Sequence, residues 1–301
     1  MSTPSKGMSA ICKVTPGSRL QLRSLDAAKL PSPEFAALEG VSLKDRARTI
    51  LDENRLALAD AQELLWASNS RSVLVVFQAM DAAGKDGTIK HVMAGLNQQG
   101  CEVHGFKRPS IEESEHNFLW RYAQKVPARG RLGIFNRSYY EEVLVVKVHP
   151  ELLAAQKVPM DVTRKTVWKE RYEDINNFER HLTRNGTLVV KFFLNISKAE
   201  QRRRLLDRLD SDSTRWKFSV EDLKERRHWA DYMSAYQDML RATSTRWAPW
   251  YVIPADHKYV ARAAVAQILI ERIRALGLQY PKPSRARTLE LTRARRHLLK
   301  S

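Results

Sequence analysis

One segment, residues 72–93, constrains the fold of this chain more than any other. It opens with a run of β-branched and aromatic residues, passes through a loop of small residues that contains Gly84, Lys85 and Gly87, and ends in a helical pattern of apolar residues. A strand, a small-residue loop, a lysine and a helix form the arrangement in which backbone N–H groups and a helix N-terminus surround a phosphate. The segment therefore predicts an α/β protein with a phosphate-binding loop (P-loop).

The loop departs from the common pattern G-x-x-x-x-G-K-[ST] at two positions. Ala79 stands where the first glycine belongs, and Asp86 stands where a hydroxyl that binds Mg²⁺ belongs. Thr88 still offers a hydroxyl to a metal, although from a displaced position. The carboxylate of Asp81 would repel an anionic ligand unless it holds Mg²⁺ or orients the phosphate that accepts transfer. We interpret Asp81 in that way, with a turn-forming aspartate as the alternative.

Lys85 is expected to bridge phosphate oxygens as a point charge, while Gly84 and Gly87 let the backbone approach the ligand. A glycine-containing turn with an incidental lysine is the alternative. The residues that we expect to bind phosphate from this segment are Ala82, Ala83, Gly84, Lys85, Asp86, Gly87, Thr88 and Lys90.

Further strand candidates follow the first, and helical patterns separate most of them. The strands are expected at residues 72–79, 101–107, 131–136, 187–195 and 250–254, after a helix at 43–68. Alternating strands and helices predict a parallel five-stranded sheet with helices on both faces, a three-layer α/β sandwich.

The end of the third strand carries a second group of polar candidates. A strand end beside a P-loop commonly supplies an acid for the metal, but here the position holds Asn136. Arg137 is well placed to clamp phosphates as a bidentate donor. The nearest acids are Glu141 and Glu142, and Arg108, after the second strand, is expected to face an acceptor nucleotide.

The formal net charge of the chain is +17, which implies an anionic partner: a nucleic acid, a membrane surface or a polyanionic substrate. Residues 1–24 are expected to form a flexible basic arm, residues 25–282 the globular domain and residues 283–301 a basic tail. Residues 198–220 are rich in arginine and are expected to form a helical lid over the phosphate site. A solvated surface helix is the alternative.

Several classes of protein are disfavoured. The two cysteines, Cys12 and Cys101, lie far apart and indicate neither a disulfide framework nor a zinc site. No apolar run approaches the roughly 18 residues of a membrane span. The first 24 residues do not resemble a secretory signal. We therefore expect a cytoplasmic enzyme.

Taken together, these segments resemble the second family of polyphosphate kinases, from about residue 45 to 282. The matching segments are AMDAAGKDGTIKHVM, FLWRYAQKVPARG, IFNRSYYEEVLVVKVH, KFFLNIS, RWKFSVEDLKERRHWADYMSAY and TSTRWAPWYVIPA. The resemblance implies a P-loop kinase fold similar to thymidylate kinase. It also implies transfer of phosphoryl groups between inorganic polyphosphate and adenine or guanine nucleotides, with Mg²⁺ (or Mn²⁺), by a homodimer or homotetramer.

The resemblance also implies roles for individual residues. Many members carry D-R-S-W-Y-N where this chain has N-R-S-Y-Y-E, so the acid is lost at Asn136 and gained at Glu141. This pattern is similar to the class III branch, which phosphorylates both nucleoside mono- and diphosphates. The expected catalytic residues are Asp81, Lys85 and Arg137; the metal ligands are Asp81 and Glu141; the nucleotide contacts are Asp81, Arg108, Asn136 and Glu141; and the polyphosphate contacts beyond the P-loop are Arg137, Arg204, Arg208, Arg215 and Lys217.

Two alternatives stay open. The first is an ATP-dependent nucleotide kinase on the same scaffold. The second is a basic nucleic-acid-binding protein with a vestigial P-loop, which the net charge allows. The chain lacks a helix-turn-helix, zinc-finger or RNP signature that would favour the second.

Overall fold

The computed structural model describes residues 7–36, 38–156, 158 and 166–300. Its centre is a parallel sheet of five strands in the order β2-β3-β1-β4-β5, so the strand before the P-loop is central. The strands are β1 (Ser72–Gln78), β2 (Cys101–Gly105), β3 (Leu132–Asn136), β4 (Thr187–Asn195) and β5 (Trp250–Pro254). The predicted α/β fold with five parallel strands is confirmed, and each predicted strand lies within two residues of an observed one.

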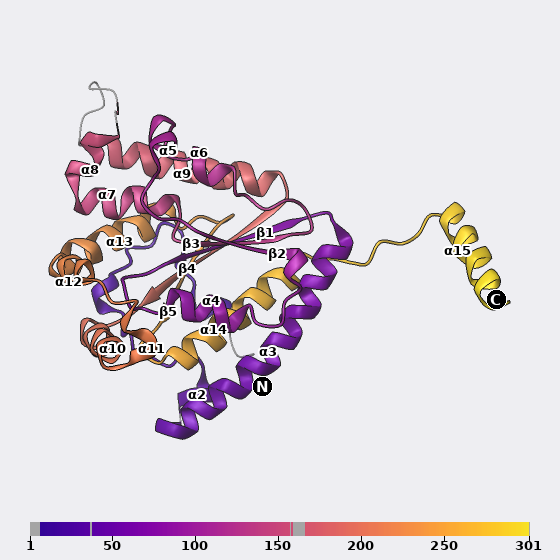
Figure 1. Cartoon of the computed structure of the whole chain (residues 1–301), viewed down its shortest axis with the longest axis horizontal. Coiled ribbons are helices and arrows are strands. Elements are labelled where there is room, and N and C mark those ends of the chain that lie inside the picture. Colours follow the sequence, from indigo (N-terminus) through magenta and orange to yellow (C-terminus); the bar gives the residue numbers. More distant parts are fainter. Residues whose placement is uncertain (1–6, 37, 157, 159–165, 301) are drawn as a thin grey trace.

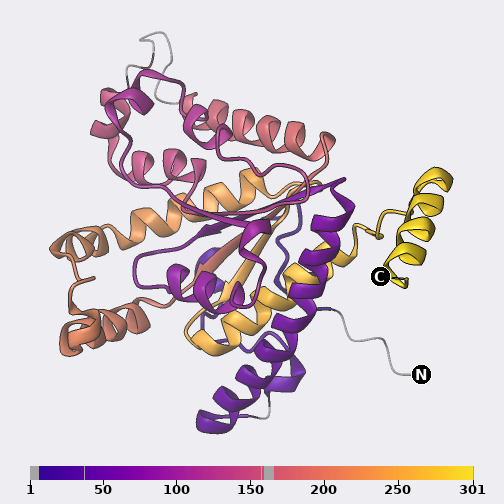
Figure 2. The same cartoon turned by 45° about the vertical axis from the view of Figure 1, so that its right-hand side comes forward.

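Helices cover both faces of the sheet, as expected for a parallel sheet whose central strands are largely apolar (Figure 1; Figure 2). The helices α3 (Gly40–Ser68), α4 (Lys85–Val92) and α14 (Lys258–Arg274) pack together on one face. The other face carries α5 (Ile111–Glu115), α6 (Trp120–Ala123), α7 (Val145–Val148), α8 (Pro150–Ala155), α9 (Val167–Arg184) and α13 (Trp229–Thr243). The short 3₁₀ helices are η1 (Leu22–Ser24), η2 (Gln98–Gly100) and η3 (Tyr139–Val143).

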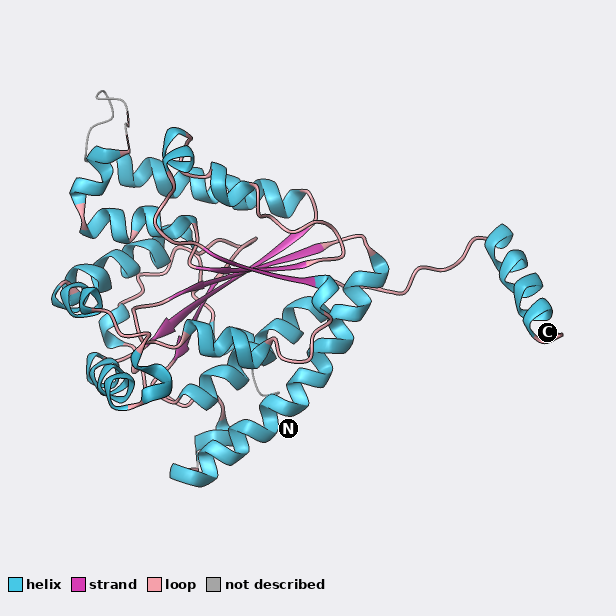
Figure 3. Cartoon of the chain, viewed as in Figure 1, coloured by secondary structure: helices cyan, strands magenta, loops and turns pink. Residues whose placement is uncertain are grey.

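All strand arrowheads point to the same end of the sheet, where the remaining helices of the connection between β4 and β5 lie (Figure 3). These helices are α10 (Lys198–Asp210), α11 (Asp212–Arg215) and α12 (Val220–Arg227). Ligands of open parallel sheets bind outside the carboxyl ends of the strands, where neighbouring connections leave in opposite directions. The P-loop follows β1 at this end, and the ends of β3 and β4 flank it.

The N-terminal segment differs from its expectation. Within the described residues 7–24, the helix α1 (Met8–Cys12) and the chain after it pack on the edge strand β5. The N–H of Val14 donates to the carbonyl of Trp250 (2.9 Å), and Ser244 Oγ donates to the carbonyl of Val14 (2.7 Å). The prediction of a flexible arm is wrong for these residues: Cys12 and Val14 are buried where the segment packs on β5, and Leu22 is buried where η1 packs on α13.

The C-terminal residues lie apart from the body of the molecule. After α14, an extended stretch leads to a further helix, α15 (Arg285–Leu298), and every described residue from 279 onward is exposed (Figure 1). The short helix α2 (Pro33–Ala36) lies at the other end of the chain, next to α3. Among the described residues, no helix joins the length and the apolarity that crossing a bilayer requires.

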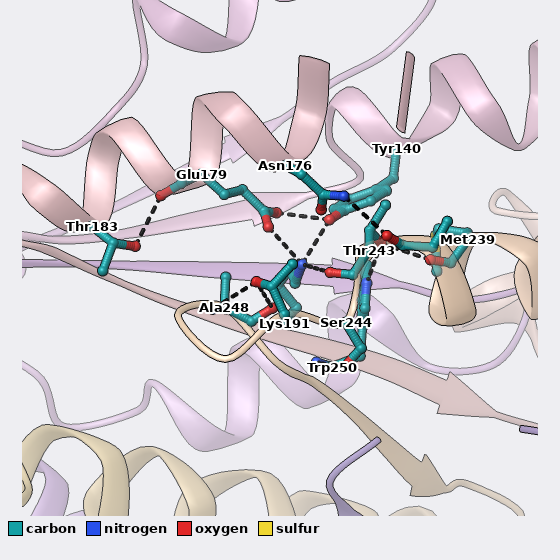
Figure 4. A network of polar contacts seen from close by, with 12 residues as sticks. Tyr140, Asn176, Glu179, Thr183, Lys191, Met239, Thr243, Ser244, Ala248 and Trp250 are labelled. Atoms are coloured by element: carbon teal, nitrogen blue, oxygen red, sulfur yellow. Dashed lines mark hydrogen bonds and ion pairs between the residues drawn. The ribbon is translucent and has the colours of Figure 1, made fainter. Parts of the chain in front are cut away.

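A buried polar network ties the sheet to the segment that follows β3 (Figure 4). Lys191 lies in the middle of β4 and is fully buried. Its ammonium group donates to Glu179 (2.6 Å), to the hydroxyl of Tyr140 (2.8 Å) and to the carbonyl of Thr243 (2.8 Å). Burial lowers the pKa of Lys191 to about 8, although Glu179 acts in the opposite direction. The network thereby joins β4 to α9, α13 and η3.

The same carboxylate fixes the start of η3. Glu179 accepts hydrogen bonds from the hydroxyls of Tyr139 (2.9 Å) and Tyr140 (2.7 Å). Because η3 begins at Tyr139, three residues after the end of β3, the network positions the polar residues on either side of it. Those residues form part of the site described next.

Candidate functional site

The P-loop adopts the backbone conformation that its small residues predict. Ala82 (φ +60°) and Gly84 (φ +101°) lie in the left-handed region, which favours residues without a branched side chain. The helix α4 begins at Lys85, and its first turn closes with a hydrogen bond from Thr88 N–H to the carbonyl of Gly84 (2.8 Å). The free N–H groups of this first turn therefore point toward the carboxyl end of the sheet.

Lys85 lies over the loop that precedes it. Its ammonium group donates to the carbonyl of Ala79 (2.6 Å) and reaches the carbonyl of Met80 (3.5 Å). Burial lowers the pKa of Lys85, and the nearby guanidinium of Arg137 lowers it further. Lys85 contacts Ala79 and Met80, and Arg137 contacts Asp81, so two cations from different strand ends lie along the same three residues of the loop. This arrangement favours binding of an anion there.

Arg137 sits between two carboxylates. It follows β3 in the left-handed conformation (φ +64°), and its backbone N–H donates to the carbonyl of Phe77 in β1 (3.2 Å). Its guanidinium lies 3.3 Å from Asp81 Oδ1 and 3.8 Å from Glu141 Oε2. Glu141 raises the pKa of Arg137 most, burial opposes it, and Asp81 adds to the increase. The structure therefore brings together Asp81, Arg137 and Glu141.

Asn136 and Asp86 form a pair that sequence reasoning missed. The amide Nδ2 of Asn136 donates to Asp86 Oδ1 at 2.6 Å. Each residue departs from the common pattern: an amide replaces the acid after β3, and an acid replaces the hydroxyl in the P-loop. One contact accounts for both departures. The common pattern has an acid after the strand and a hydroxyl in the loop, whereas here the amide after the strand is the donor and the acid in the loop is the acceptor. In the sequence, the joint occurrence of these two departures was the signal that could have predicted the pair.

Arg204 of α10 holds the P-loop itself. Its Nε donates to Glu200 (2.7 Å), its Nη1 to the carbonyl of Ala83 (2.8 Å), and its Nη2 to the carbonyls of Ala255 (2.5 Å) and Asp256 (3.1 Å). These acceptors occupy the donor directions of the guanidinium. These contacts place Arg204 against the backbone of the P-loop, and its binding of polyphosphate stays a prediction.

The other predicted cations of the lid segment lie at different distances from the loop. Arg208 pairs with Asp222 of α12 (3.2 Å). Arg215 contacts its own segment, through Asp212 (3.2 Å) and the carbonyl of Leu209 (2.8 Å). Lys217 is exposed and stacks on Trp216. The structure thus brings Arg208 toward the site and leaves Arg215 and Lys217 at the surface; Lys90, on α4, is also exposed.

Two adjoining cavities open in front of the P-loop. The first, about 260 Å³, is lined by Asp81, Arg137, Glu141, Asp222 and Glu225, among others. Burial raises the pKa of Asp222, and the charge of Asp81 raises it further. Asp222 and Glu225 come from α12, and sequence reasoning missed them because acids and bases are mixed there in equal number without a motif.

The second cavity, about 680 Å³, shares Arg137 and Glu141 with the first. Arg108 lines it, as do His149 and Lys224. Its volume is in the range of sites for small ligands. Arg108 therefore lines the same cavity as Glu141, the other residue that was predicted to contact the nucleotide there.

The site fits a divalent cation that arrives with phosphates. Among the described residues, no three side chains of the ligating types converge on one point. The carboxylates of Asp81 and Glu141 nevertheless lie on either side of Arg137 at the first cavity. Mg²⁺ in phosphate-transferring sites is commonly held by one or two carboxylates together with substrate phosphates and water. Two carboxylates without a complete protein cage match that pattern.

Comparisons with known proteins agree with this geometry. A family model described as polyphosphate kinase 2 (PPK2) matches residues 42–280. The chain is 52% identical over 244 residues to a protein of Rhodopseudomonas palustris named ADP-polyphosphate phosphotransferase. This alignment covers 81% of this chain and 84% of the relative. The chain is also 43% identical over 277 residues to the AMP/ADP-polyphosphate phosphotransferase of Meiothermus ruber. That alignment covers 91% of this chain and 96% of the relative.

A solved structure extends the likeness to three dimensions. The crystal structure of polyphosphate kinase 2 from Arthrobacter aurescens aligns with a TM-score of 0.86 at 38% sequence identity. The alignment covers 99% of this chain and 98% of that one. The likeness therefore includes the P-loop, the strand ends beside it and the helices of the connection between β4 and β5.

Proposed function

The chain belongs to the polyphosphate kinase 2 family, and from this premise we propose that it transfers phosphoryl groups reversibly between inorganic polyphosphate and the adenine nucleotides AMP and ADP. The observation that supports the proposal best is the convergence of Lys85 and Arg137 at a P-loop, beside a second cavity that Arg108 lines. The end of the polymer binds at the two cations, and the nucleotide occupies the second cavity.

The chemistry needs no nucleophile from the protein. A terminal phosphate oxygen of the nucleotide attacks the last phosphorus of the polymer in line. A new P–O bond forms while the bond to the next phosphate of the polymer breaks, and the shortened polymer leaves with that oxygen. Lys85, Arg137 and the N–H groups of the first turn of α4 stabilise the charge of the transferred group, because positioning and charge neutralisation dominate phosphoryl transfer.

Asp81 and Glu141 are the residues that would hold the Mg²⁺ (or Mn²⁺) implied by the family. When bound, the ion supplies positive charge that shields the phosphate oxygens from one another. Asn136 and Asp86 contribute by fixing the P-loop to the end of β3 through their 2.6 Å contact.

The proposal is tested by supplying polyphosphate with AMP or with ADP, in the absence of ATP, and measuring the nucleotide products. ADP and ATP are expected from AMP, and ATP from ADP. An enzyme that makes neither, yet phosphorylates AMP with ATP, would be the ATP-dependent kinase that the sequence left open. The nucleic-acid-binding alternative leaves both the family match and the paired cavities unexplained.

Use of both AMP and ADP is assigned here to Glu141, as in the class III branch. Replacing Glu141 with asparagine removes the carboxylate beside Arg137 at the wall that the two cavities share. We expect the ratio of kcat/KM for AMP to that for ADP to change about tenfold, since one charge-assisted contact is altered for one acceptor more than for the other. Glu151→Gln, at the exposed rim of the second cavity, is the matched control, and an unchanged ratio in Glu141→Asn contradicts the assignment.

Arg204→Gln is expected to lower kcat/KM about a hundredfold, because a displaced P-loop no longer aligns the phosphates. Steady-state kinetics with polyphosphate and ADP measure the effect. Arg203→Gln is the control, since Arg203 lies next to Arg204, also pairs with Glu200 and is 57% exposed. Equal losses in the two variants would show that Arg204 does not position the loop. A cytoplasmic location, the use of guanine nucleotides and assembly into dimers or tetramers stay predictions.

A further inference from the structure

A second group of cations lies beside the P-loop helix, on the face of the sheet that α3 and α14 cover. Four cationic groups surround the ring of Tyr259, at 5.3 Å for Lys44, 5.1 Å for Arg48, 5.4 Å for Lys258 and 5.6 Å for Arg262. We call these five residues the Tyr259 cluster. They come from the N-terminal parts of two helices that are far apart in the sequence and packed together in the fold.

The cluster has little compensating negative charge. In the part of the chain that the structure describes, the ion pair that it makes with a carboxylate is Arg48 with Asp45, at 3.8 Å and with both side chains more than half exposed. Such a pair contributes little to stability. The Nε of Arg262 is buried without a hydrogen-bond partner. Like charges held together in this way cost free energy in the absence of an anion, so their convergence indicates a binding surface.

The electrostatics of the ring support this interpretation. Burial acts to raise the pKa of Tyr259, but the charges of Lys258, Lys44 and Arg48, with a contribution from Arg262, outweigh it and lower the pKa. The potential around the ring is therefore strongly positive. Cation–π contacts hold the side chains in place without consuming the N–H donors of the cations.

The cluster continues directly from the P-loop. The guanidinium of Arg262 lies so close to the first turn of α4 that a Cβ atom at Gly87 would stand 3.1 Å from its Nη2. Burial lowers the pKa of Arg262, and the charges of Arg204, Arg55 and Arg48 lower it further. Positive charge thus extends from the loop carbonyls held by Arg204, past Gly87, to the Tyr259 cluster.

We propose that the Tyr259 cluster binds a distal stretch of the polyphosphate chain whose terminal group lies at Lys85 and Arg137. The inference rests on the proposed function and adds to it the course of the polymer. A polymer of repeated phosphates matches a group of cations that has little compensating negative charge among the described residues and continues away from the site of transfer. Short chains, which end before the cluster, do not use it.

The test compares long-chain polyphosphate with tripolyphosphate in the triple variant Lys44→Gln/Arg48→Gln/Lys258→Gln. We expect KM for the long chain to rise roughly tenfold, since each lost surface charge contact contributes a small part of the binding free energy. KM for tripolyphosphate, KM for ADP and kcat are expected to stay as in the wild type. The salt dependence of KM for the long chain should also become weaker.

The matched control removes three cations at a distance: Arg285→Gln/Arg287→Gln/Arg293→Gln in the exposed helix α15. An equal rise of the long-chain KM in this variant would show general attraction by net charge and overturn the site. A rise for tripolyphosphate as large as that for the long chain would also overturn it. Thermal unfolding checks that the triple variant is folded, and its midpoint should not fall, since repulsion is relieved.

The two proposals fail in distinguishable ways. Turnover of tripolyphosphate and ADP by the wild type tests the proposed function alone. Titration calorimetry of the wild type and the triple variant with long-chain polyphosphate, without nucleotide, tests the cluster alone. Weaker binding by the triple variant supports the cluster, whereas equal binding rules it out even if the enzyme is active.

Discussion

Replacing Lys85 with alanine is expected to lower kcat/KM for phosphoryl transfer from polyphosphate by about a thousandfold or more. Lys85 supplies a point charge at the start of α4, where the transferred group must be stabilised, and the effect of such a charge is large in a site that excludes water. Burial and the charge of Arg137 lower the pKa of Lys85, although Asp81, Glu141 and Asp86 act in the opposite direction. Because burial of the ammonium group itself costs free energy, the folded state should lose little stability with it.

The measurement is steady-state kinetics with polyphosphate and ADP, together with circular dichroism and thermal unfolding of the variant. Lys169→Ala, which removes an exposed lysine from α9, serves as the matched control and should retain full activity. Lys85→Arg should not restore turnover, because a planar guanidinium does not replace a compact ammonium group in a loop of this size. Activity of Lys85→Ala within tenfold of the wild type would refute the assigned role.

Replacing Glu179 with alanine is expected to lower the free energy of unfolding by about 3–5 kcal/mol, the largest effect on stability that we predict. The carboxylate is fully buried and accepts hydrogen bonds from Lys191 and Tyr140 (Figure 4). It also accepts a hydrogen bond from the hydroxyl of Tyr139. Its removal leaves a buried ammonium group without its counter-charge and two hydroxyls without their acceptor. Urea denaturation of the wild type and the variant measures the difference.

The exposed pair Arg287–Glu290 in α15 provides the control. Its atoms lie 2.9 Å apart, but both side chains are 63% exposed, so Glu290→Ala should change stability by no more than about 0.5 kcal/mol. The double variant Glu179→Leu/Lys191→Met should recover much of the loss, since it removes both buried charges at similar volume. If Glu179→Ala is as mild as Glu290→Ala, the network does not hold η3 in place.

Local pattern was sufficient for the frame of the fold. The strands β1 and β4 are buried throughout and mostly apolar, as parallel strands covered on both faces are, although Lys191 interrupts the apolar run of β4. The P-loop was recognisable because its geometry depends on residues adjacent in sequence: an αL glycine, a lysine at the first helical position and the strand before it. Such features are encoded within a few residues, so a single sequence reveals them.

Contacts across the sheet were beyond the reach of pattern. The pairing of Asn136 with Asp86 joins residues 50 positions apart, and the bonds from Arg204 to the P-loop span more than 120. An arginine in a charged helix has the same sequence signature whether it binds a ligand or a carbonyl of the protein. The N-terminal segment was misjudged for a similar reason, since its few apolar residues acquire meaning only against the edge of β5.

The sequence by itself determined the parallel sheet, the phosphate-binding loop, the identity of its lysine and the family, because these follow from local propensity and from strings of adjacent residues. The tertiary structure alone decided which cations donate hydrogen bonds to acceptors of the protein and which lie mainly among other cations. Arg204 donates to backbone carbonyls and to Glu200, whereas the Tyr259 cluster gathers cations from two helices with one weak carboxylate contact among the described residues. Whether a charge is available depends on its neighbours in space, and the order of residues along the chain does not specify them.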